Sequence, residues 1–289
     1  MRSDPIRLEP AARRRVHVPG PDFAGLSPQE LADLTRAVGL LESASLPVRL
    51  ANLVGSPVEK LVGQLPAPAV AVVKTAVDSA LAYSMKAALV SLGTPPAGIR
   101  RRPWLDAALR RDWVAKAGTV IAGGMGGAGG LAGTVIELPV TTALILRGIA
   151  QIGLDEGEDI ASDEFKATCL SVLAMGGRSP VDDAGESGYY AVRVALADAI
   201  VQAAGLSLAD LFPKLAVKIA KKFGSAALMK VSAQAVPLAG AVAGAAINFV
   251  FMDHFQDKAR GHFIVRRLER AHGPRIVRAG YDVIQRSLT

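Results

Sequence analysis

Apolar residues recur at helical spacing along most of this chain, and short groups of Pro, Gly and Ser separate the apolar runs. No segment alternates apolar and polar positions with β-branched residues over a sustained run, so the pattern predicts no regular strands. Residues 27–30, SPQE, carry the N-cap Ser, the N1 Pro and the N3 Glu of a capping box, and they predict a helix toward Leu41. The same signature at 56–59, SPVE, predicts another helix start. We therefore expect an all-α fold.

Glycine and proline mark the limits of the later helices. A long helix rich in Ala and Val should follow Pro68 and end near Leu92, and another should pass through Glu137 and Arg147. The other expected helices run from Ser162 to Gly176, from Gly188 to Ala204 and from Ser207 onward. A break at Gly273-Pro274 should separate the last two helices of the chain. The chain then holds about nine or ten helices.

Composition places these helices in one domain. The chain has 289 residues, of which 51% are hydrophobic and 5% aromatic, so its core is built from small and aliphatic side chains. Residues 1–25 lack the apolar run of a secretory signal peptide, and we expect a flexible basic tail there, before a helical domain over residues 26–289. The single cysteine, Cys169, excludes an intramolecular disulfide, favours a reducing compartment, and is expected in the core.

Two pairs of glycines have the small-xxx-small spacing that lets helix backbones approach closely. They are Gly126 with Gly130, and Gly240 with Gly244. We expect the two Gly-rich segments that contain them to form a helix pair at the centre of the domain.

Two blocks of sequence combine glycine spacing with isolated polar residues. They are GGMGGAGGLAGTVIELPVTTALILRGIAQIG, residues 123–153, and VPLAGAVAGAAINFVFMDHFQDKARGHFIVRRLER, residues 236–270. Together they resemble the EcsC family, a bacterial group named from an operon that also encodes an ABC transporter, and the resemblance extends over residues 30–285. It implies a helical protein that works near a membrane, with a membrane transport component as its partner. The resemblance brings no catalytic residues.

Two stretches without a charged residue are long enough to span a bilayer. Residues 117–136 number 20, and residues 231–252 number 22. The first holds eight glycines, and the second contains Gln234, Pro237 and Asn248, so their drive to insert is weak. Buried helices of a compact domain are the favoured interpretation, and membrane insertion is the alternative.

Glu137 and Arg147 are isolated ionisable residues in the apolar run VIELPVTTALILRGIA. On one helix they are about 80° apart around the axis and about 15 Å apart along it, so they cannot pair with each other. Each needs another partner, because an unpaired buried charge is costly. The candidate partners are Asn248, Asp253, His254, Arg266 and Arg267. A structural network is the favoured interpretation; the alternative is an enzyme site formed by Glu137, Arg147, Asn248 and Asp253.

Residues 212–223, FPKLAVKIAKKF, form a basic amphipathic pattern. On a helical wheel an apolar arc that includes Phe212, Ile219 and Phe223 faces away from four lysines. The lysines are Lys214, Lys218, Lys221 and Lys222. A surface helix packed on the domain and an interfacial helix on anionic lipid are equally open interpretations. The formal net charge of +7 favours an acidic partner in either case.

No motif identifies a metal, a cofactor or a reaction. His254 and His262 lie eight residues apart without a coordination sphere, and we expect both on a helix surface. Residues 124–129 match GxGxxG, but the predicted helices leave no βαβ unit to bind a dinucleotide. Nucleic acid ranks below lipid as a partner, because the basic stretches lack interleaved aromatic residues.

These observations favour a membrane-associated accessory protein, not an enzyme, that binds anionic lipid through a basic amphipathic surface. It would be cytoplasmic and peripheral, at the inner face of the membrane. Two alternatives stay open: an enzyme that acts on a lipid or small amphiphile, and a protein-interaction scaffold.

Overall fold

The fold is all-α, as the sequence pattern predicted. A computed structural model describes residues 25–92, 130–176, 189–190, 193–194, 223–233 and 240–288, and these residues form helices and short connections without a strand. The helices are α1 (Pro28–Leu41), α2 (Leu46–Val54), α3 (Val58–Gly63), α4 (Ala67–Leu92), α7 (Gly130–Asp155), α8 (Asp163–Gly176), α11 (Gly240–His272) and α12 (Pro274–Leu288). Residues 223–233 are also helical. The predicted tail over residues 1–25 lies, except for Gly25, outside the described residues.

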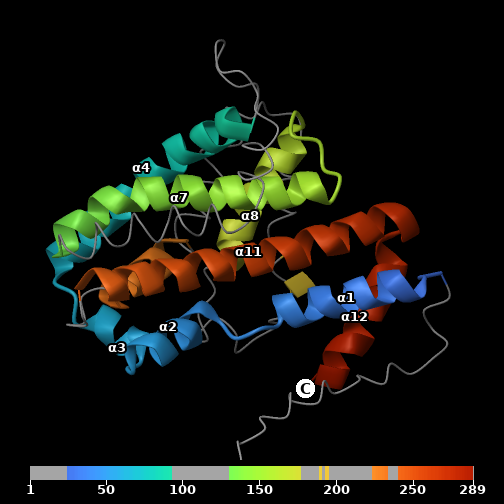
Figure 1. The fold of residues 1–289 in the computed structure, drawn as a ribbon, viewed down its shortest axis with the longest axis horizontal. Coiled ribbons are helices and arrows are strands. Elements are labelled where there is room, and N and C mark those ends of the chain that lie inside the picture. Colours follow the sequence, from blue (N-terminus) through green and yellow to red (C-terminus); the bar gives the residue numbers. More distant parts are fainter. Residues whose placement is uncertain are drawn as a thin grey trace, which may run out of the picture.

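Helix α11, 33 residues long, crosses the middle of the domain. It packs against α1 and α2 on one side and against α7 on the other, and α8 and α12 also contact it (Figure 1). α4 lies along α7. The predicted central pair of helices is therefore α7 with α11. The two run in the same direction, because Gly148 lies beside Gln256 and Gly153 beside Phe263.

Close approaches between helices are described at three glycines, Gly153, Gly176 and Gly261. Gly126 is outside the described residues, and Gly130 and Gly240 are the first residues of α7 and α11. A Cβ atom at Gly261 of α11 would lie 2.6 Å from Leu41 Cγ of α1. In the same way, Gly153 of α7 makes room for the rings of Phe165 and Phe263, and Gly176 for the ring of Phe255. Of these three glycines, Gly261 and Gly176 have no small residue four positions away, whereas Gly153 has Gly157.

Most helix limits follow the predicted signals. Ser27 and Glu30 form the capping box at the start of α1, and Ser162 Oγ accepts a hydrogen bond from the backbone N–H of Phe165, 3.0 Å away, at the start of α8. Two details differ from the prediction. α3 begins at Val58 after Pro57, without a side-chain cap at Ser56, and the short helix α2 was not predicted.

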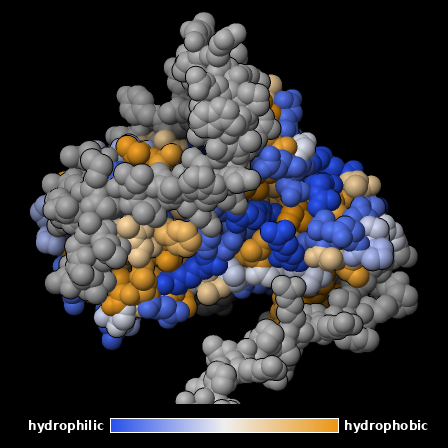
Figure 2. All heavy atoms as spheres, in the orientation of Figure 1, coloured by the Kyte–Doolittle hydropathy of each residue, from blue (hydrophilic) through white to orange (hydrophobic). Residues whose placement is uncertain are grey.

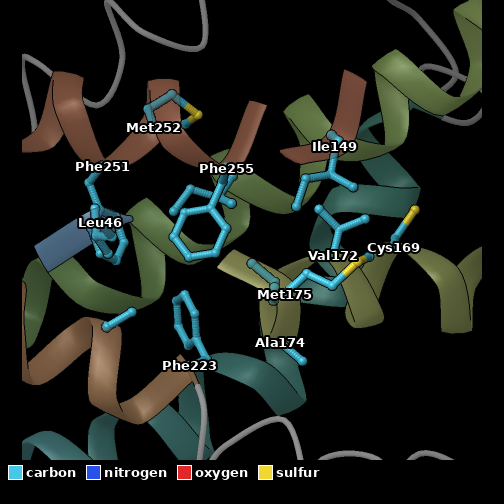
Figure 3. Packing of buried hydrophobic residues seen from close by; sticks show 14 of the residues in the cluster. Leu46, Ile149, Cys169, Val172, Ala174, Met175, Phe223, Phe251, Met252 and Phe255 are labelled. Carbon is cyan, nitrogen blue, oxygen red and sulfur yellow. The ribbon is translucent and has the colours of Figure 1, made fainter. Parts of the chain in front are cut away.

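Aromatic side chains from α11 and from residues 223–233 form the centre of the core (Figure 3). The ring of Phe255 lies 5.7 Å from that of Phe223 and 5.1 Å from that of Phe251, centroid to centroid. Ile149 of α7 and Cys169 of α8 lie in the same core, so the predicted burial of Cys169 is confirmed. Burial raises the pKa of the Cys169 thiol, which keeps it unreactive at neutral pH.

Within the described part of the chain, no single helix has the length and hydropathy of a membrane span. α1 and α2 have the length and hydropathy of a span only when they are taken together, and the chain bends by 61° between them. Of the uncharged stretch 231–252, the structure describes residues 231–233, which are helical, and residues 240–252, which belong to α11.

Candidate functional site

A buried polar cluster joins α7, α11 and the helix at 223–233. Glu137 Oε1 accepts hydrogen bonds from Lys230 Nζ at 2.7 Å and from Thr141 Oγ1 at 3.0 Å. Asn248 Nδ2 of α11 donates to the same oxygen. The side chain of Lys230 is fully buried and that of Glu137 is 3% exposed. We call Glu137, Lys230 and Asn248 the buried triad.

Electrostatics within the buried triad favour the ionised form of Glu137. Burial alone would raise the pKa of Glu137, but the Lys230 ammonium and the two further hydrogen bonds outweigh burial and hold that pKa below its usual value. Burial lowers the pKa of Lys230, and the Glu137 carboxylate opposes that shift. Desolvation offsets much of the attraction in such a pair, so its main effect is to fix how three helices fit together.

The four residues of the proposed enzyme site do not meet in one accessible pocket. Glu137 and Asn248 pair as predicted, but both are buried. Asp253 lies on another side of α11, about 140° around the axis from Asn248, and accepts a hydrogen bond from Arg49 of α2 at 3.2 Å. Arg147 is half-buried, ten residues beyond Glu137 on α7, and burial lowers its pKa. The structure therefore brings Glu137 and Asn248 together and places Asp253 and Arg147 apart from them.

Sequence reasoning missed Lys230. Lys230 directly precedes the uncharged stretch 231–252. Its signal was present, because it is the only charged residue among residues 223–233. A lysine that is buried in an apolar helix needs a carboxylate as its partner. Glu137 is likewise an isolated charged residue in an apolar run of the sequence.

The other proposed partners of Glu137 pair elsewhere. Arg266 Nε donates to Glu158 at 2.8 Å, and Arg267 Nε donates to Glu156 at 2.6 Å. These pairs belong to an ion-pair network between the last part of α11 and the connection from α7 to α8. The network borders a pocket of about 530 Å³. The arginines that line this pocket already bind carboxylates of the protein.

His254 and His262 of α11 are core residues, so the expectation of a surface position was wrong. His254 Nε2 donates to the Gly176 carbonyl at 2.9 Å, and burial lowers the pKa of His254 to about 3. His262 Nδ1 shares a hydrogen bond of 2.8 Å with the hydroxyl of Tyr189, and burial holds its pKa well below the usual value. The described residues contain no group of three or more His, Cys, Asp or Glu that could hold a metal ion.

Phe223 also differs from its predicted role. It is the one described residue of the basic segment 212–223, and it is fully buried against Phe251 and Phe255. That position cannot face lipid while the core is closed. The four lysines of the segment, with Phe212 and Ile219, lie outside the described residues.

The described surface has an apolar end. Eight large hydrophobic side chains of the described residues are exposed, and five of them, between 38% and 52% exposed, belong to helices that reach this end. They are Val48 and Leu53 of α2, Val72 of α4, Val140 of α7 and Phe249 of α11. These segments, namely α2 and the first parts of α4, α7 and α11, lie together at the left of Figure 1. We call these five residues the apolar end.

Charged residues gather at the opposite end. The last turns of α7 and α11, which carry the ion-pair network, lie at the right of Figure 1. Figure 2 shows the same division on one face: hydrophobic residues collect at the lower left, over α2 and α3, and hydrophilic residues predominate toward the right. The asymmetry could not be predicted from hydropathy alone, since Val72 and Val140 lie in helices that also contribute to the core.

Comparison with known proteins identifies the chain at the level of its family. No curated protein and no solved structure matches it. The model of the EcsC protein family matches residues 41–268, which include α11 almost to its end and all three residues of the buried triad. The match covers most of the chain and agrees with the resemblance of residues 123–153 and 236–270. The chain therefore belongs to the EcsC protein family.

Proposed function

We propose that this protein is a membrane-associated accessory protein that docks its apolar end on an anionic bilayer. The observation that supports the proposal is the set of five exposed apolar side chains on α2, α4, α7 and α11, with the largest group of ion pairs located around the last part of α11. Exposed valine, leucine and phenylalanine side chains gathered on one face are typical of an interaction surface.

The surroundings of the apolar end fit lipid with a negative charge. Residues 46–77 include only four charged side chains, of which Glu59 is the single acidic one. Arg49 is already paired with Asp253 and Asp257, whereas Lys60 and Lys74 are exposed. Basic residues beside an apolar surface add attraction to anionic lipid, up to about 1 kcal/mol each. The formal net charge of +7 acts in the same direction.

The basic segment 212–223 extends the proposal. Because Phe223 lies in the core, the segment contributes to membrane binding through charge, which comes from Lys214, Lys218, Lys221 and Lys222. This arrangement gives a peripheral protein at the inner, cytoplasmic face of the membrane, next to a membrane transport component. The enzyme alternative loses its main support, because the four proposed site residues do not converge.

Co-flotation with vesicles tests the proposal. The purified full-length protein is mixed with phosphatidylcholine vesicles that contain increasing phosphatidylglycerol, and the floated fraction is washed with high salt or with carbonate. We expect binding that rises with anionic lipid and that high salt reverses. Binding that survives the carbonate wash would show inserted segments instead. No binding at any composition would overturn the proposal and favour a protein partner for the apolar end.

A further inference from the structure

The pocket of about 530 Å³ beside the ion-pair network is lined by several separate parts of the chain. Residues between 157 and 164, which connect α7 to α8 and begin α8, contribute to it, and so do residues of the last two turns of α11. Arg193 and Pro274, the first residue of α12, also line it. A volume of this size is typical of pockets that hold small organic molecules.

Charged side chains of both signs line this pocket. They are Arg193, Arg266 and Arg270, and the carboxylates Glu158, Asp159, Glu164 and Glu269. The side chains of Glu158 and Glu269 are only 7% and 9% exposed, whereas that of Glu164 is 69% exposed. Asp159 is also exposed, and its carboxylate accepts a hydrogen bond of 2.9 Å from the backbone N–H of Ala161. Water screens the two exposed carboxylates more than the two buried ones, so the buried pair decides how well the arginines are neutralised.

The two buried carboxylates do not balance the three arginines. Glu269 accepts two hydrogen bonds from Arg193, of 2.7 and 2.5 Å. Glu158 accepts from Arg266 at 2.8 Å and also from Arg270. Burial opposes the ionisation of Glu158, but the two arginines outweigh burial and hold its pKa below the usual value. One carboxylate therefore neutralises two guanidinium groups, and the three arginines with their two buried partners carry one excess positive charge.

Glu164 brings a negative charge to these arginines from the solvent side. Its carboxylate accepts one hydrogen bond, of 3.0 Å, from Arg266 Nη2. An ion pair with so exposed a carboxylate contributes little to stability. An oxyanion from solution can therefore replace the Glu164 carboxylate without disturbing the fold. The bound carboxylate marks the position at Arg266 that such an oxyanion would take.

We propose that this pocket binds a small phosphate ester, whose phosphate group replaces the Glu164 carboxylate on Arg266. Guanidinium groups bind phosphate through paired hydrogen bonds, and Arg270 lies one helical turn beyond Arg266, where it can share the phosphate. The remaining volume holds the organic part of the ester. The inference goes beyond membrane docking and does not depend on it, because none of the five residues of the apolar end lines this pocket.

Glu164→Gln tests the site, because it removes the competing carboxylate and keeps the size of the side chain. The matched control is Asp163→Asn, which removes the same charge one position earlier. Asp163 is 59% exposed, pairs with Lys166 at 2.8 Å and is not among the residues that line the pocket. The full-length proteins are titrated with glycerol 3-phosphate by calorimetry, at neutral pH and low salt.

Glu164→Gln should bind glycerol 3-phosphate at least about tenfold more tightly than the wild type, and Asp163→Asn should bind it like the wild type. Arg270→Gln, added to Glu164→Gln, should remove the gain, while Arg266 still pairs with the buried Glu158. No binding to Glu164→Gln, an affinity equal to that of the wild type, or the same gain in Asp163→Asn would each overturn the site.

Vesicles distinguish the two sources of a phosphate ester, a soluble molecule and a lipid head group. The same variants are floated with phosphatidylglycerol vesicles. A gain in flotation for Glu164→Gln over Asp163→Asn, parallel to the gain with glycerol 3-phosphate, would assign the pocket to a lipid head group. A gain with glycerol 3-phosphate and equal flotation of the two variants would assign it to a soluble ester.

Discussion

The ammonium of Lys230 lies 2.7 Å from the carboxylate of Glu137, and both side chains are shielded from solvent. The two residues are 93 positions apart in the chain, so the contact joins α7 to the helix at 223–233. Asn248 of α11 binds the same carboxylate oxygen, and three helices thereby meet at one charge pair. A small displacement of any one of them separates charges that water cannot reach.

Removal of one member of this pair should be more harmful than removal of both. Glu137→Gln leaves Lys230 buried without its counter-charge, which should lower the free energy of unfolding by about 3–5 kcal/mol. Adding Lys230→Met should recover most of that loss. A double-mutant cycle by urea denaturation measures the coupling, and additive effects of the two substitutions would mean that the pair does not interact in solution.

Two glycines on facing helices should respond in opposite ways to alanine. A Cβ atom at Gly261 of α11 meets Leu41 Cγ at 2.6 Å and the carbonyl oxygen of Ala37 at 3.0 Å, so Gly261→Ala should cost about 1–3 kcal/mol. Gly39 in α1 has no atom within 4 Å of such a Cβ, and Gly39→Ala should stabilise the protein by about 0.5–1 kcal/mol. Thermal melts of both variants check this, and equal effects would show that α1 does not pack on α11 as described.

The buried histidines should make the protein less stable as the pH falls below 6.5. Burial lowers the pKa of His254 to about 3 and holds the pKa of His262 well below 6.5, so in this range the unfolded state binds protons that the folded state does not. Each histidine then removes up to about 1.4 kcal/mol of stability per pH unit as the pH falls. Urea denaturation between pH 5 and 6.5, where most carboxylates are already ionised, measures the slope. His254→Gln should reduce it, and an unchanged slope would place His254 in solvent.

The four lysines of the basic segment should contribute to membrane binding through charge alone. Replacement of Lys214, Lys218, Lys221 and Lys222 by Glu should weaken binding to phosphatidylglycerol vesicles by about 1 kcal/mol or more per residue at low salt. The control is Arg275→Glu with Arg286→Glu on α12, which carries exposed arginines away from the apolar end. If the control loses as much binding per charge as the lysine variant, the attraction comes from net charge rather than from this segment.

Local signals predicted the helices well, because caps and breakers act over a few residues. The capping box at Ser27 and the Gly273-Pro274 break both occur where expected. α2 was missed because it is short and Ser45, its N-cap residue, makes no side-chain hydrogen bond at its start. The helix start predicted at residues 56–59 corresponds to α3, which begins at Val58 with Pro57 rather than Ser56 in the N-cap position.

The candidate site was less predictable, because burial and exposure depend on contacts between distant segments. Glu137 and Asn248 were recognisable as polar residues in apolar surroundings, and they do pair. His254 looked like a surface residue because α11 carries many charges, yet several elements cover this central helix and bury it. Val140 shows the reverse: its sequence is that of a core helix, and its side chain is 52% exposed.

The most direct test of the membrane account compares the two ends of the domain. One variant carries Val48→Asp, Leu53→Asp and Val72→Asp at the apolar end. The control carries Ile276→Asp and Leu288→Asp, which replace exposed hydrophobic residues of α12. In flotation with phosphatidylglycerol vesicles, the first variant should lose most of its binding and the control should bind like the wild type. Equal binding of both variants and the wild type would contradict docking through the apolar end.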